Sequence, residues 1–426
     1  MTRDVVAEIV DYNRPLLAEG RAVLDEAGVD VTREAVRRKL EALATSPFAF
    51  FRGTFHLMVR DLFKARVPLA APAAPDGLIV GDLHLENFGV YRGATGGLCF
   101  DVNDFDDVGF GPVDLDLKRL CTSALLLPGL GHGPRLAAAK ALARSWAEAI
   151  GRIGGRFPVA AFDCDKAEPP VAALLVEQGK RTREALVLKA APDKGHKKFG
   201  NQGEPRKFAH VGKQWSQLVE KSLTEYLESL KQLKVEVSHT WDLLDVAYRF
   251  KGTGSLGRLR FQALIGRGDD RRIVEVKEAR PCALDEEKGR PPPAQRGRVQ
   301  TASIRRLQGN PWPRVAGTHL GKASALCREI QAEEEKLDSD RFAAGQGDAD
   351  HHLLISYSKQ CGDVTARLHC RENAPLLLDA AGFDPAKAAQ QAVEFAEKYA
   401  PQVEADQKAF AQAKAAITSA LGLDKP

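Results

Sequence analysis

Cysteine is scarce in this chain of 426 residues and is not arranged to bind a metal or to form a full set of disulfides. The seven cysteines lie scattered, without the Cys-x-x-Cys spacing of a zinc site. An odd number cannot pair completely, and free thiols are usual where the environment is reducing. The cysteine content argues against a disulfide-stapled secreted domain and predicts a cytoplasmic protein.

Long hydrophobic runs and a large net charge are also missing. No stretch of about 18 apolar residues is present, so we expect no membrane span. The first 20 residues lack the apolar core of a signal peptide. A net charge of +4 is small for this length and gives no reason to expect a nucleic-acid partner. The 44% of apolar residues is ordinary for a globular chain that could hold two or three domains.

Two short acidic motifs are the most informative feature that is present. The first is Asp82 with Asn87 five residues later, in Gly-Asp-Leu-His-Leu-Glu-Asn, and the second is Asp104 in Asn-Asp-Phe-Asp. Phosphoryl transfer from a nucleotide uses one carboxylate to accept the hydroxyl proton, and an Asn with a second carboxylate to hold Mg²⁺. The motifs predict that Asp82 is the catalytic residue and that Asn87 and Asp104 bind the metal.

The segment between the two motifs has the pattern of a β-hairpin. Residues 88–91 and 98–100 are apolar strand candidates, and the Gly-rich segment 92–97 joins them. Such a hairpin would carry the chain out and back and bring Asp104 close to Asn87. Mg²⁺ takes few protein carboxylates and completes its shell with phosphate oxygens and water. The spacing therefore suits one shared metal site.

A Gly-rich segment far downstream, residues 252–257, matches Gly-x-Gly-x-x-Gly. Alone this motif is weak, and a dinucleotide-binding fold is its usual meaning. The flanking pattern indicates strands at 246–250, 258–265 and 273–279, whereas a dinucleotide site needs a helix after the glycines. Two strands joined by a Gly-rich turn, with a lysine on the third strand, suit a loop that covers a nucleotide and a lysine that binds its phosphates. We expect ATP to be bound by Gly252, Gly254, Ser255, Gly257 and Lys277.

These elements together resemble known kinases. The Gly-rich segment with Lys277 looks like the small lobe of a protein-kinase-like fold, and the loop from Asp82 to Asn87 is most similar to that of aminoglycoside and choline kinases. Residues 114–117, Asp-Leu-Asp-Leu, resemble the acidic segment that follows the metal-binding Asp in those enzymes. The Gly-rich segment here follows the catalytic loop by about 165 residues, so the resemblance implies circular permutation. The overall pattern from Ser46 onward also resembles a bacterial family catalogued as domain of unknown function 2252.

The resemblance implies an α+β, kinase-like two-lobe fold, circularly permuted, with a small antiparallel β lobe and a large, mainly helical lobe. It predicts an N-terminal helical segment of the large lobe (1–77) and the catalytic and metal loops with further helices (78–243). The small nucleotide-binding lobe (244–335) and the C-terminal helices of the large lobe (336–426) follow. A helix at 298–307, a hinge strand at 325–330 and a helix at 353–369 would complete the cyclic order.

The remaining chain is expected to be mostly helical. Helical spacing of apolar residues predicts helices at 5–24, 32–44, 115–127, 134–153, 170–190, 214–233 and 386–421. We expect a Pro/Ala-rich linker at 66–77 and loops at 191–213 and 283–297. The basic stretch from Lys194 to Lys207 is either a solvated loop or a surface that attracts an acidic substrate. Core positions are expected at Phe48, Phe50 and Phe51.

Each site residue has a plainer alternative. Asp82 and Asn87 could cap a turn, and His84 could belong to a metal site, although no second histidine stands at ligand spacing. Lys277 could be an exposed strand residue, and helix 298–307 contains no glutamate to pair with it. Arg52 is either a buried structural cation or a phosphate contact.

The sequence as a whole predicts an ATP-dependent phosphotransferase that uses Mg²⁺ and moves the γ-phosphate to a hydroxyl of a small-molecule or protein acceptor. The competing class is a non-catalytic nucleotide-binding regulator, to which the missing partner of Lys277 points. A third alternative is nucleotidyl transfer to a protein, with ATP reversed in the same fold. The identity of the acceptor does not follow from the sequence, because a fold does not fix a substrate.

Overall fold

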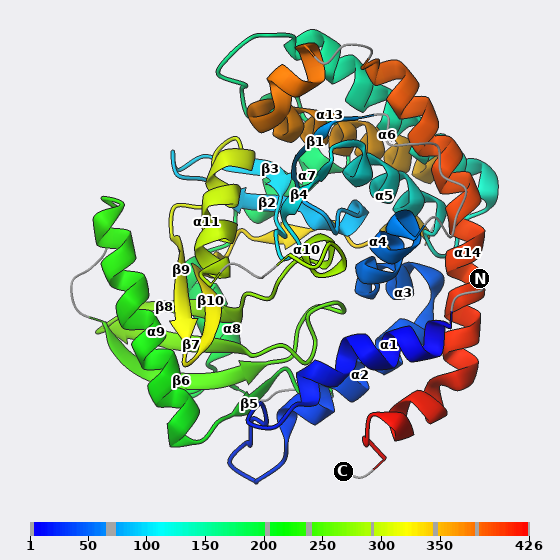
Figure 1. Cartoon of the computed structure of the whole chain (residues 1–426). Coiled ribbons are helices and arrows are strands. Elements are labelled where there is room, and N and C mark those ends of the chain that lie inside the picture. The colour runs from blue at the N-terminus through cyan, green and yellow to red at the C-terminus, as the bar shows by residue number, and fades with distance from the viewer. Residues whose placement is uncertain are drawn as a thin grey trace.

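The computed structural model describes residues 4–64, 74–200, 205–235, 241–290, 294–343, 348–379 and 383–424. It is a mixed α+β structure in which every described strand pair is antiparallel (Figure 1). This confirms the expected combination of helices and antiparallel sheet. Of the expected linker at 66–77, residues 66–73 lie outside the described part of the chain.

The largest sheet has six strands and carries the Gly-rich segment. Its strands lie in the order β5-β6-β7-β8-β10-β9. The bounds are Phe208–His210 (β5), Asp242–Arg249 (β6), Arg260–Arg267 (β7), Asp270–Glu278 (β8), Val315–Leu320 (β9) and Ala323–Glu329 (β10). Helices α9 (Lys213–Gln232) and α11 (Arg296–Leu307) both pack against β9. The strands predicted around the Gly-rich segment and at Lys277 are therefore confirmed as β6, β7 and β8.

Two smaller sheets lie among the helices. Strands β2 (Phe88–Arg92) and β3 (Leu98–Val102) form the predicted hairpin, β11 (Glu335–Lys336) extends it, and β1 (Asp76–Ile79) pairs with β4 (Gly109–Pro112). The longer surrounding helices are α1 (Val5–Asn13), α2 (Val31–Thr45), α3 (Pro47–Gly53), α4 (Phe55–Phe63), α5 (Asp114–Leu125), α6 (His132–Ile153), α7 (Val171–Gln178), α8 (Arg183–Ala190), α13 (Asp348–Asp379) and α14 (Pro385–Ala420). The short helix α10 (Ala283–Glu287) packs against α4.

Two of the predicted helices are wrong in extent. The helix expected at 5–24 ends at Asn13, and the chain makes a short 3₁₀ turn and then reaches a β-bridge at Leu24. Pro15 in this turn has no N–H to continue the helical hydrogen bonds. The helix expected at 170–190 divides into α7 and α8, because the Thr182 side chain accepts a hydrogen bond from the Ala185 N–H and starts a new helix.

Helix α2 holds the six-stranded sheet against the helical part of the molecule. Val31 and Ala35 belong to the hydrophobic core of the sheet, whereas Val36 and Leu40 belong to the larger core of the helices and small sheets. In Figure 1, α1 and α2 accordingly lie between the sheet and α14. Phe48, Phe50 and Phe51 are buried in the larger core, which confirms the core prediction. The two parts are thus packed together by shared helices.

A buried carboxylate fixes the entrance of the loop that carries Asp82. Asp116 on α5 accepts hydrogen bonds from the backbone N–H groups of Val80 and Gly81, both at 2.8 Å. His369 on α13 accepts from the Trp146 indole at Nδ1, so its proton lies on Nε2, which donates to Asp116 at 3.1 Å. Asp116, His369 and Trp146 are all inaccessible to solvent. One side chain therefore joins the loop, α5 and α13.

Removal of this carboxylate tests its structural role. We expect Asp116→Ala to lower the free energy of unfolding by about 3–5 kcal/mol, because several buried donors lose their acceptor at once. Urea denaturation followed by circular dichroism measures the change. Asp165→Ala, at an exposed position, is the control and should change stability by less than about 0.5 kcal/mol. A loss below about 1 kcal/mol in Asp116→Ala would contradict the anchoring role.

Candidate functional site

One cavity collects nearly all of the predicted site residues. Its lining includes the predicted catalytic residue, both predicted metal ligands, the lysine and three of the four residues predicted to bind ATP in the Gly-rich segment, namely Asp82, Asn87, Asp104, Lys277, Gly252, Gly254 and Ser255. These residues come from the six-stranded sheet on one side and from the loops of the small sheets on the other. Gly257 does not line the cavity. Its φ is +88°, and a Cβ there would stand 2.6 Å from Val36 on α2.

The loop from Asp82 to Asn87 is shaped by its own side chains. His84 caps a short 3₁₀ helix, Leu85–Asn87, by accepting the Glu86 N–H at Nδ1 (3.2 Å), and Asn87 accepts the His84 N–H (3.2 Å). Burial lowers the pKa of His84 well below its usual value, so the ring is neutral and free to accept this bond. Among the described residues, no group of three or more His, Cys, Asp or Glu side chains is placed to hold a metal. The hydrogen bonds that His84 makes within the loop support a loop-shaping role.

The β2–β3 hairpin returns the chain to this loop, as the sequence predicted. Phe88 pairs with Val102, and the Asn103 N–H donates to the Asn87 carbonyl at 2.8 Å. Asp104 follows at once, so it and Asn87 face the same cavity. Burial and the neighbouring charge of Asp106 raise the pKa of Asp104. The two residues offer one carboxylate and one amide oxygen, which is the sparse ligand set that suits Mg²⁺ bound to phosphates and water.

Asp82 is held by an arginine that the sequence analysis did not identify. Arg119 on α5 donates to the Asp82 carboxylate from Nε at 2.7 Å and also contacts the Phe51 ring and carbonyl. Arg119 is fully buried, whereas the Asp82 side chain is 22% exposed toward the cavity. Burial raises the pKa of Asp82 to about 7, with Asp107 and Asp104 adding to the effect and Arg119 opposing it. Asp82 therefore changes its charge near neutral pH.

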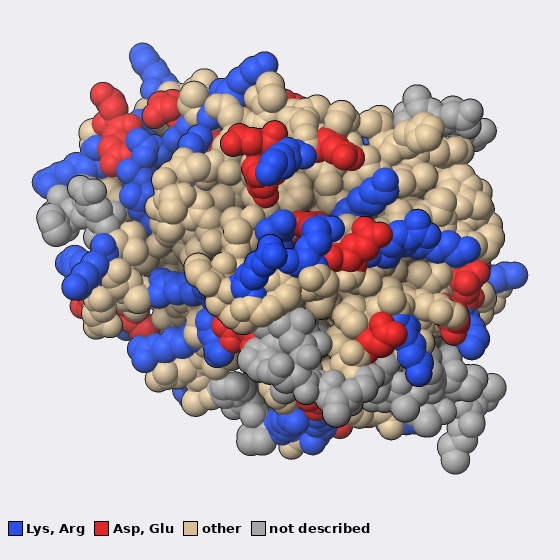
Figure 2. All heavy atoms as spheres, turned by 90° about the horizontal axis from the view of Figure 1, so that it is seen from above, with Lys and Arg blue, Asp and Glu red and all other residues tan. Residues whose placement is uncertain are grey.

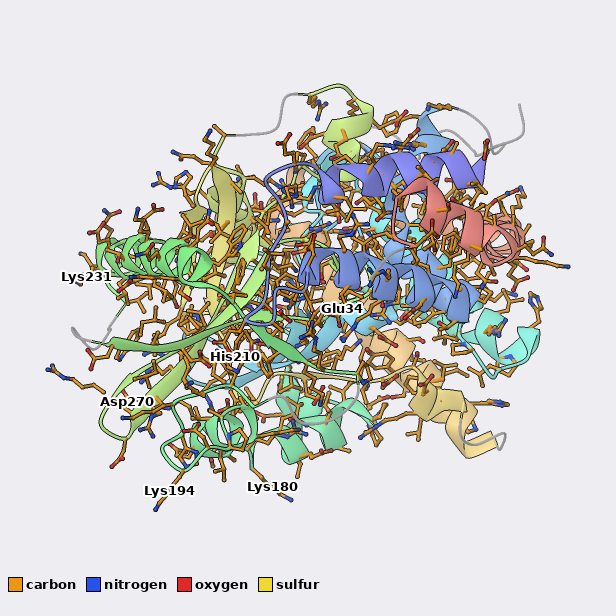
Figure 3. The ribbon with its side chains drawn as sticks, turned by 90° about the horizontal axis from the view of Figure 1, so that it is seen from below. Glu34, Lys180, Lys194, His210, Lys231 and Asp270 are labelled. Atoms are coloured by element: carbon orange, nitrogen blue, oxygen red, sulfur yellow. The ribbon has the colours of Figure 1, made fainter. Side chains whose placement is uncertain are left out.

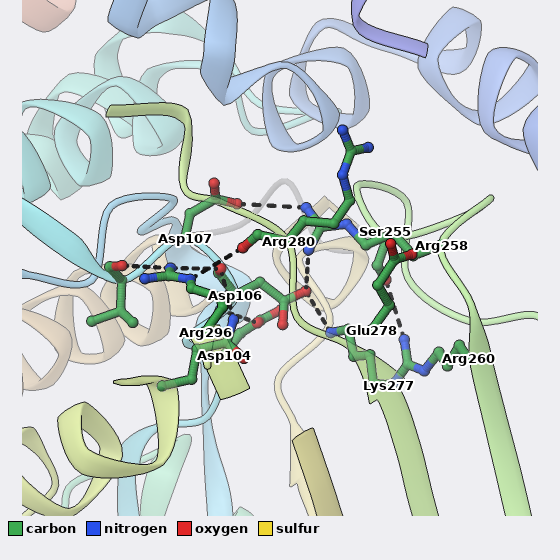
Figure 4. Close-up of polar contacts among 12 residues, drawn as sticks. Asp104, Asp106, Asp107, Ser255, Arg258, Arg260, Lys277, Glu278, Arg280 and Arg296 are labelled. Carbon is green, nitrogen blue, oxygen red and sulfur yellow. Dashed lines mark hydrogen bonds and ion pairs between the residues drawn. The ribbon is translucent and has the colours of Figure 1, made fainter. Parts of the chain in front are cut away.

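Lys277 has a partner, and the partner lies beside the predicted metal residue (Figure 4). Its ammonium group is 2.5 Å from the Asp106 carboxylate, which Arg258 also approaches at 3.3 Å. Burial alone would raise the pKa of Asp106, but Lys277 and Arg258 lower it below its usual value. Lys277 is only 9% exposed, so the alternative of an exposed strand residue is wrong. The signal was present in the sequence, because Asp106 belongs to the same Asp-Phe-Asp motif as Asp104.

A row of buried ion pairs forms the inner wall of the cavity. Glu275, two residues before Lys277 on β8, is 2.7 Å from Arg260 of β7 and 3.9 Å from Arg328 of β10. Arg328 also binds Glu334 in two contacts of 2.5 and 3.0 Å. Despite burial, the cations hold the pKa of Glu275 well below its usual value. The period-2 alternation of β8, which places Glu275 and Lys277 on one face, is the sequence signal that could have found this wall.

The Gly-rich segment is joined to this wall through Ser255. The Ser255 hydroxyl donates to the Lys251 carbonyl and accepts from Arg260, both at 3.2 Å. Gly252 has φ +81°, and a Cβ there would stand 2.6 Å from Ser255 Oγ. A glycine is therefore required at position 252, because it tolerates this backbone angle and leaves room for the Ser255 hydroxyl.

The basic stretch has two separate roles in the structure. Lys194, Lys197 and Lys198 are exposed, and Lys194 points outward in Figure 3. Arg206 instead pairs with Asp25 at 2.7 Å and Glu34 at 2.5 Å. Figure 2 views the molecule from the side opposite to Figure 3, and there lysine and arginine are interspersed with acidic residues. The exposed lysines fit the solvated-loop interpretation, and Arg206 is structural.

The comparisons identify the family but no function. A family model described as "Uncharacterized protein conserved in bacteria (DUF2252)" matches residues 32–413. Because this match spans most of the chain, the chain belongs to that family, as its motifs suggested. Nothing matches among curated proteins or among solved structures. Within the described residues, no helix has both the length and the apolar character needed to cross a membrane.

The raised pKa of Asp82 predicts a pH dependence of stability. Between pH 4 and 7 the native state keeps a proton that the unfolded chain, with a pKa near 3.8, has lost. The native state then binds more protons, so the free energy of unfolding falls as the pH rises through this window. Asp82→Asn cannot lose this proton, and its stability relative to wild type should rise by about 2–4 kcal/mol from pH 4 to pH 8.

Urea titrations of both proteins at the two pH values measure this difference. Asp11→Asn, an exposed position on α1, is the matched control and should show no such trend. A difference between Asp82→Asn and wild type that stays constant with pH would mean that Asp82 is ionised throughout, with its charge fully balanced by Arg119.

Proposed function

We propose that this member of the DUF2252 family is an ATP-dependent phosphotransferase that moves the γ-phosphate of ATP to a hydroxyl of an acceptor molecule. The observation that carries the proposal is the convergence of Asp82, Asn87, Asp104 and Lys277 on one cavity beside the Gly-rich segment. These residue types are the ones that phosphoryl transfer requires, and 195 residues of chain separate the first from the last. Chance juxtaposition of the complete set is a weaker explanation than a shared site.

Each residue has a role in this proposal that suits its surroundings. Asp104 and Asn87 would hold Mg²⁺, which neutralises charge on the phosphates. Lys277 would bind phosphate oxygens, and its contact with Asp106 keeps it at the same edge of the cavity as Asp104. Asp82 would orient the acceptor hydroxyl and take its proton. A pKa of about 7 suits a general base at neutral pH, because the group is then both available and sufficiently basic.

We also propose that the fold is kinase-like in circularly permuted order. Strands β6, β7 and β8 carry the Gly-rich turn and Lys277, and α11, β9 and β10 follow in the order that such a lobe needs. The helix expected before the catalytic loop is α13, near the other end of the chain. Its Asn373 exchanges hydrogen bonds of 2.9 and 2.8 Å with the backbone of Leu78, on the strand that enters the Asp82 loop. This proximity is what a permuted connection requires.

Calorimetric titration with Mg²⁺-ATP tests the nucleotide site. We expect wild type to bind, and Lys277→Ala and Asp104→Ala to lose about tenfold or more in affinity, the size expected for a charge-assisted contact. The loss in Asp104→Ala should depend on Mg²⁺. Lys213→Ala, at an exposed position on α9, is the control. Absence of binding in wild type would reject the phosphotransferase, and binding without any turnover would favour the nucleotide-binding regulator.

Nucleotidyl transfer is the second candidate, and the inner wall of the cavity favours it. A nucleotide base is bound best by apolar surfaces, whereas Arg260, Glu275 and Arg328 make this wall charged and hydrogen-bonded. Arginine forks suit phosphate oxygens. A nucleotide bound with its phosphates toward this wall would lie in the direction opposite to the one that γ-phosphate transfer needs. The acceptor oxygen would then bond to the α-phosphorus, the bond to the β-phosphate oxygen would break, and pyrophosphate would leave.

The released product distinguishes the two candidates. Transfer of the γ-phosphate releases ADP, and nucleotidyl transfer releases pyrophosphate. We expect Asp82→Asn to lower the rate of either release by about 10²–10⁴-fold, the range for loss of a general base, while Mg²⁺-ATP affinity is kept. Chromatography of labelled ATP after incubation at pH 8 measures both products. A near-normal rate in Asp82→Asn would reject its role as a base.

A further inference from the structure

The cavity has a second side, formed by the N-terminal helices. Tyr12 of α1, Arg52 and Gly53 of α3, and Phe55 of α4 line it together with Asp82. The Phe55 ring lies 4.7 Å from the guanidinium of Arg119, the residue that holds Asp82. This side is therefore adjacent to the group that would receive the acceptor proton.

The N-terminal helices close this side against the Gly-rich segment. A Cβ on Gly254 would stand 3.3 Å from the Arg52 carbonyl, and a Cβ on Gly53 would stand 3.6 Å from Thr253. The segment that joins α1 to α2 is also tied to the sheet, because its Arg21 binds the Glu278 carboxylate of β8 through two contacts of 2.9 and 2.5 Å. This close packing bounds the cavity on the side of the N-terminal helices and suits a small molecule better than an extended peptide.

Two cations on this side share one carboxylate. Arg52 contacts Glu86 at 2.7 Å, and Lys336 binds the same carboxylate, so Glu86 alone does not balance both positive charges. The Ser339 hydroxyl also donates to Glu86, at 2.7 Å. The Arg52 side chain lines the cavity and is 19% exposed, so a ligand in the cavity can contact it. An anion that accepts hydrogen bonds from an arginine makes a charge-assisted contact, which is stronger than a neutral one.

Lys39 adds a further basic group behind Tyr12. Its ammonium group lies 5.2 Å from the centre of the Tyr12 ring, and only 1% of the residue is exposed. In the part of the chain that the structure describes, Lys39 forms neither an ion pair nor a hydrogen bond. Burial, aided by the charges of Arg258 and Arg280, lowers its pKa to about 7. An anion in the neighbouring cavity would favour the charged form.

From this geometry we infer that the side of the cavity between Asp82 and the N-terminal helices is an acceptor subsite for a small hydroxylated molecule that also carries an anionic group, a carboxylate or a phosphate. Arg52 binds the anion through its guanidinium group, and the charge of Lys39 behind Tyr12 adds to the attraction. The inference rests on the proposed function, since it is the transfer reaction that needs an acceptor. It holds for either direction of the bound nucleotide.

Matched ligand pairs test the inference. Glycerol, glycerate and glycerol 3-phosphate form one set, and glucose, gluconate and glucose 6-phosphate form another. Binding is measured as thermal stabilisation and by calorimetry, with and without Mg²⁺ and a non-hydrolysable ATP analogue. We expect the anionic members of a set to bind and the neutral member to fail. Comparing the affinity for the carboxylate member with that for the phosphate member of each set shows which anionic group the subsite prefers.

Substitutions at Arg52 and Lys39 locate the binding. Arg52→Gln should weaken the anionic ligand by about tenfold or more and leave the affinity for the ATP analogue within about twofold, while Arg52→Lys should restore part of the loss. Glu86 keeps Lys336 and Ser339 as partners in Arg52→Gln, so the fold should be retained. Lys39→Met should also weaken the anion. Arg152→Gln on α6, at a residue that is not part of the cavity lining, should behave as wild type.

Several results would overturn the inference. Equal binding of neutral and anionic members, absence of binding by every anionic member, or unchanged anion affinity in Arg52→Gln would each do so. Loss of ATP-analogue affinity in Arg52→Gln would show Arg52 to be a contact of the nucleotide phosphates instead. Failure of wild type to bind the ATP analogue would reject the proposed function. This outcome can be told apart from failure of the acceptor subsite, because anion binding is also measured without nucleotide.

Discussion

The hydrogen bonds of Asp116 are the constraint on which the candidate site depends. A carboxylate without access to solvent can remain in a core only if its oxygens are fully used. Here they accept two backbone N–H groups at the start of the Asp82 loop and the proton of His369. The loop, α5 and α13 are therefore positioned by one group. Because α5 also carries Arg119, the same helix sets both the path of the loop and the direction of Asp82.

The cavity is a network of opposite charges rather than an apolar pocket. Lys277 with Asp106, Arg260 with Glu275, and Arg328 with Glu334 are buried pairs that satisfy one another. Such pairs add little net stability, because desolvation offsets their attraction. They do hold cations in fixed positions at a site where phosphates are proposed to bind. Preorganised cations of this kind lower the reorganisation cost of binding and transfer.

The N-terminal helices give the cavity its asymmetry. They close one side against the Gly-rich segment and bring Arg52 into the same cavity as Asp82, whereas the inner wall is built by the strands of the large sheet. A phosphate chain and an acceptor would thus meet different surfaces, one rich in arginine from strands and one formed by helices. The proposed acceptor chemistry follows from this second surface alone, so it does not depend on which phosphorus is transferred.

The sequence by itself determined the local elements and picked out residues that the structure brings into one cavity. Alternation and turn residues were sufficient for the β2–β3 hairpin and for β6, β7 and β8, because these signals act between neighbours in the chain. Helices 5–24 and 170–190 were predicted too long, since apolar spacing continued past the breaks at Pro15 and Thr182. Only the tertiary structure decided that Arg119 holds Asp82, that Asp106 pairs with Lys277, and that Arg52 and Lys39 lie beside the site. Those contacts join residues that are far apart in the chain, where the pattern of any one segment carries no information about its partner.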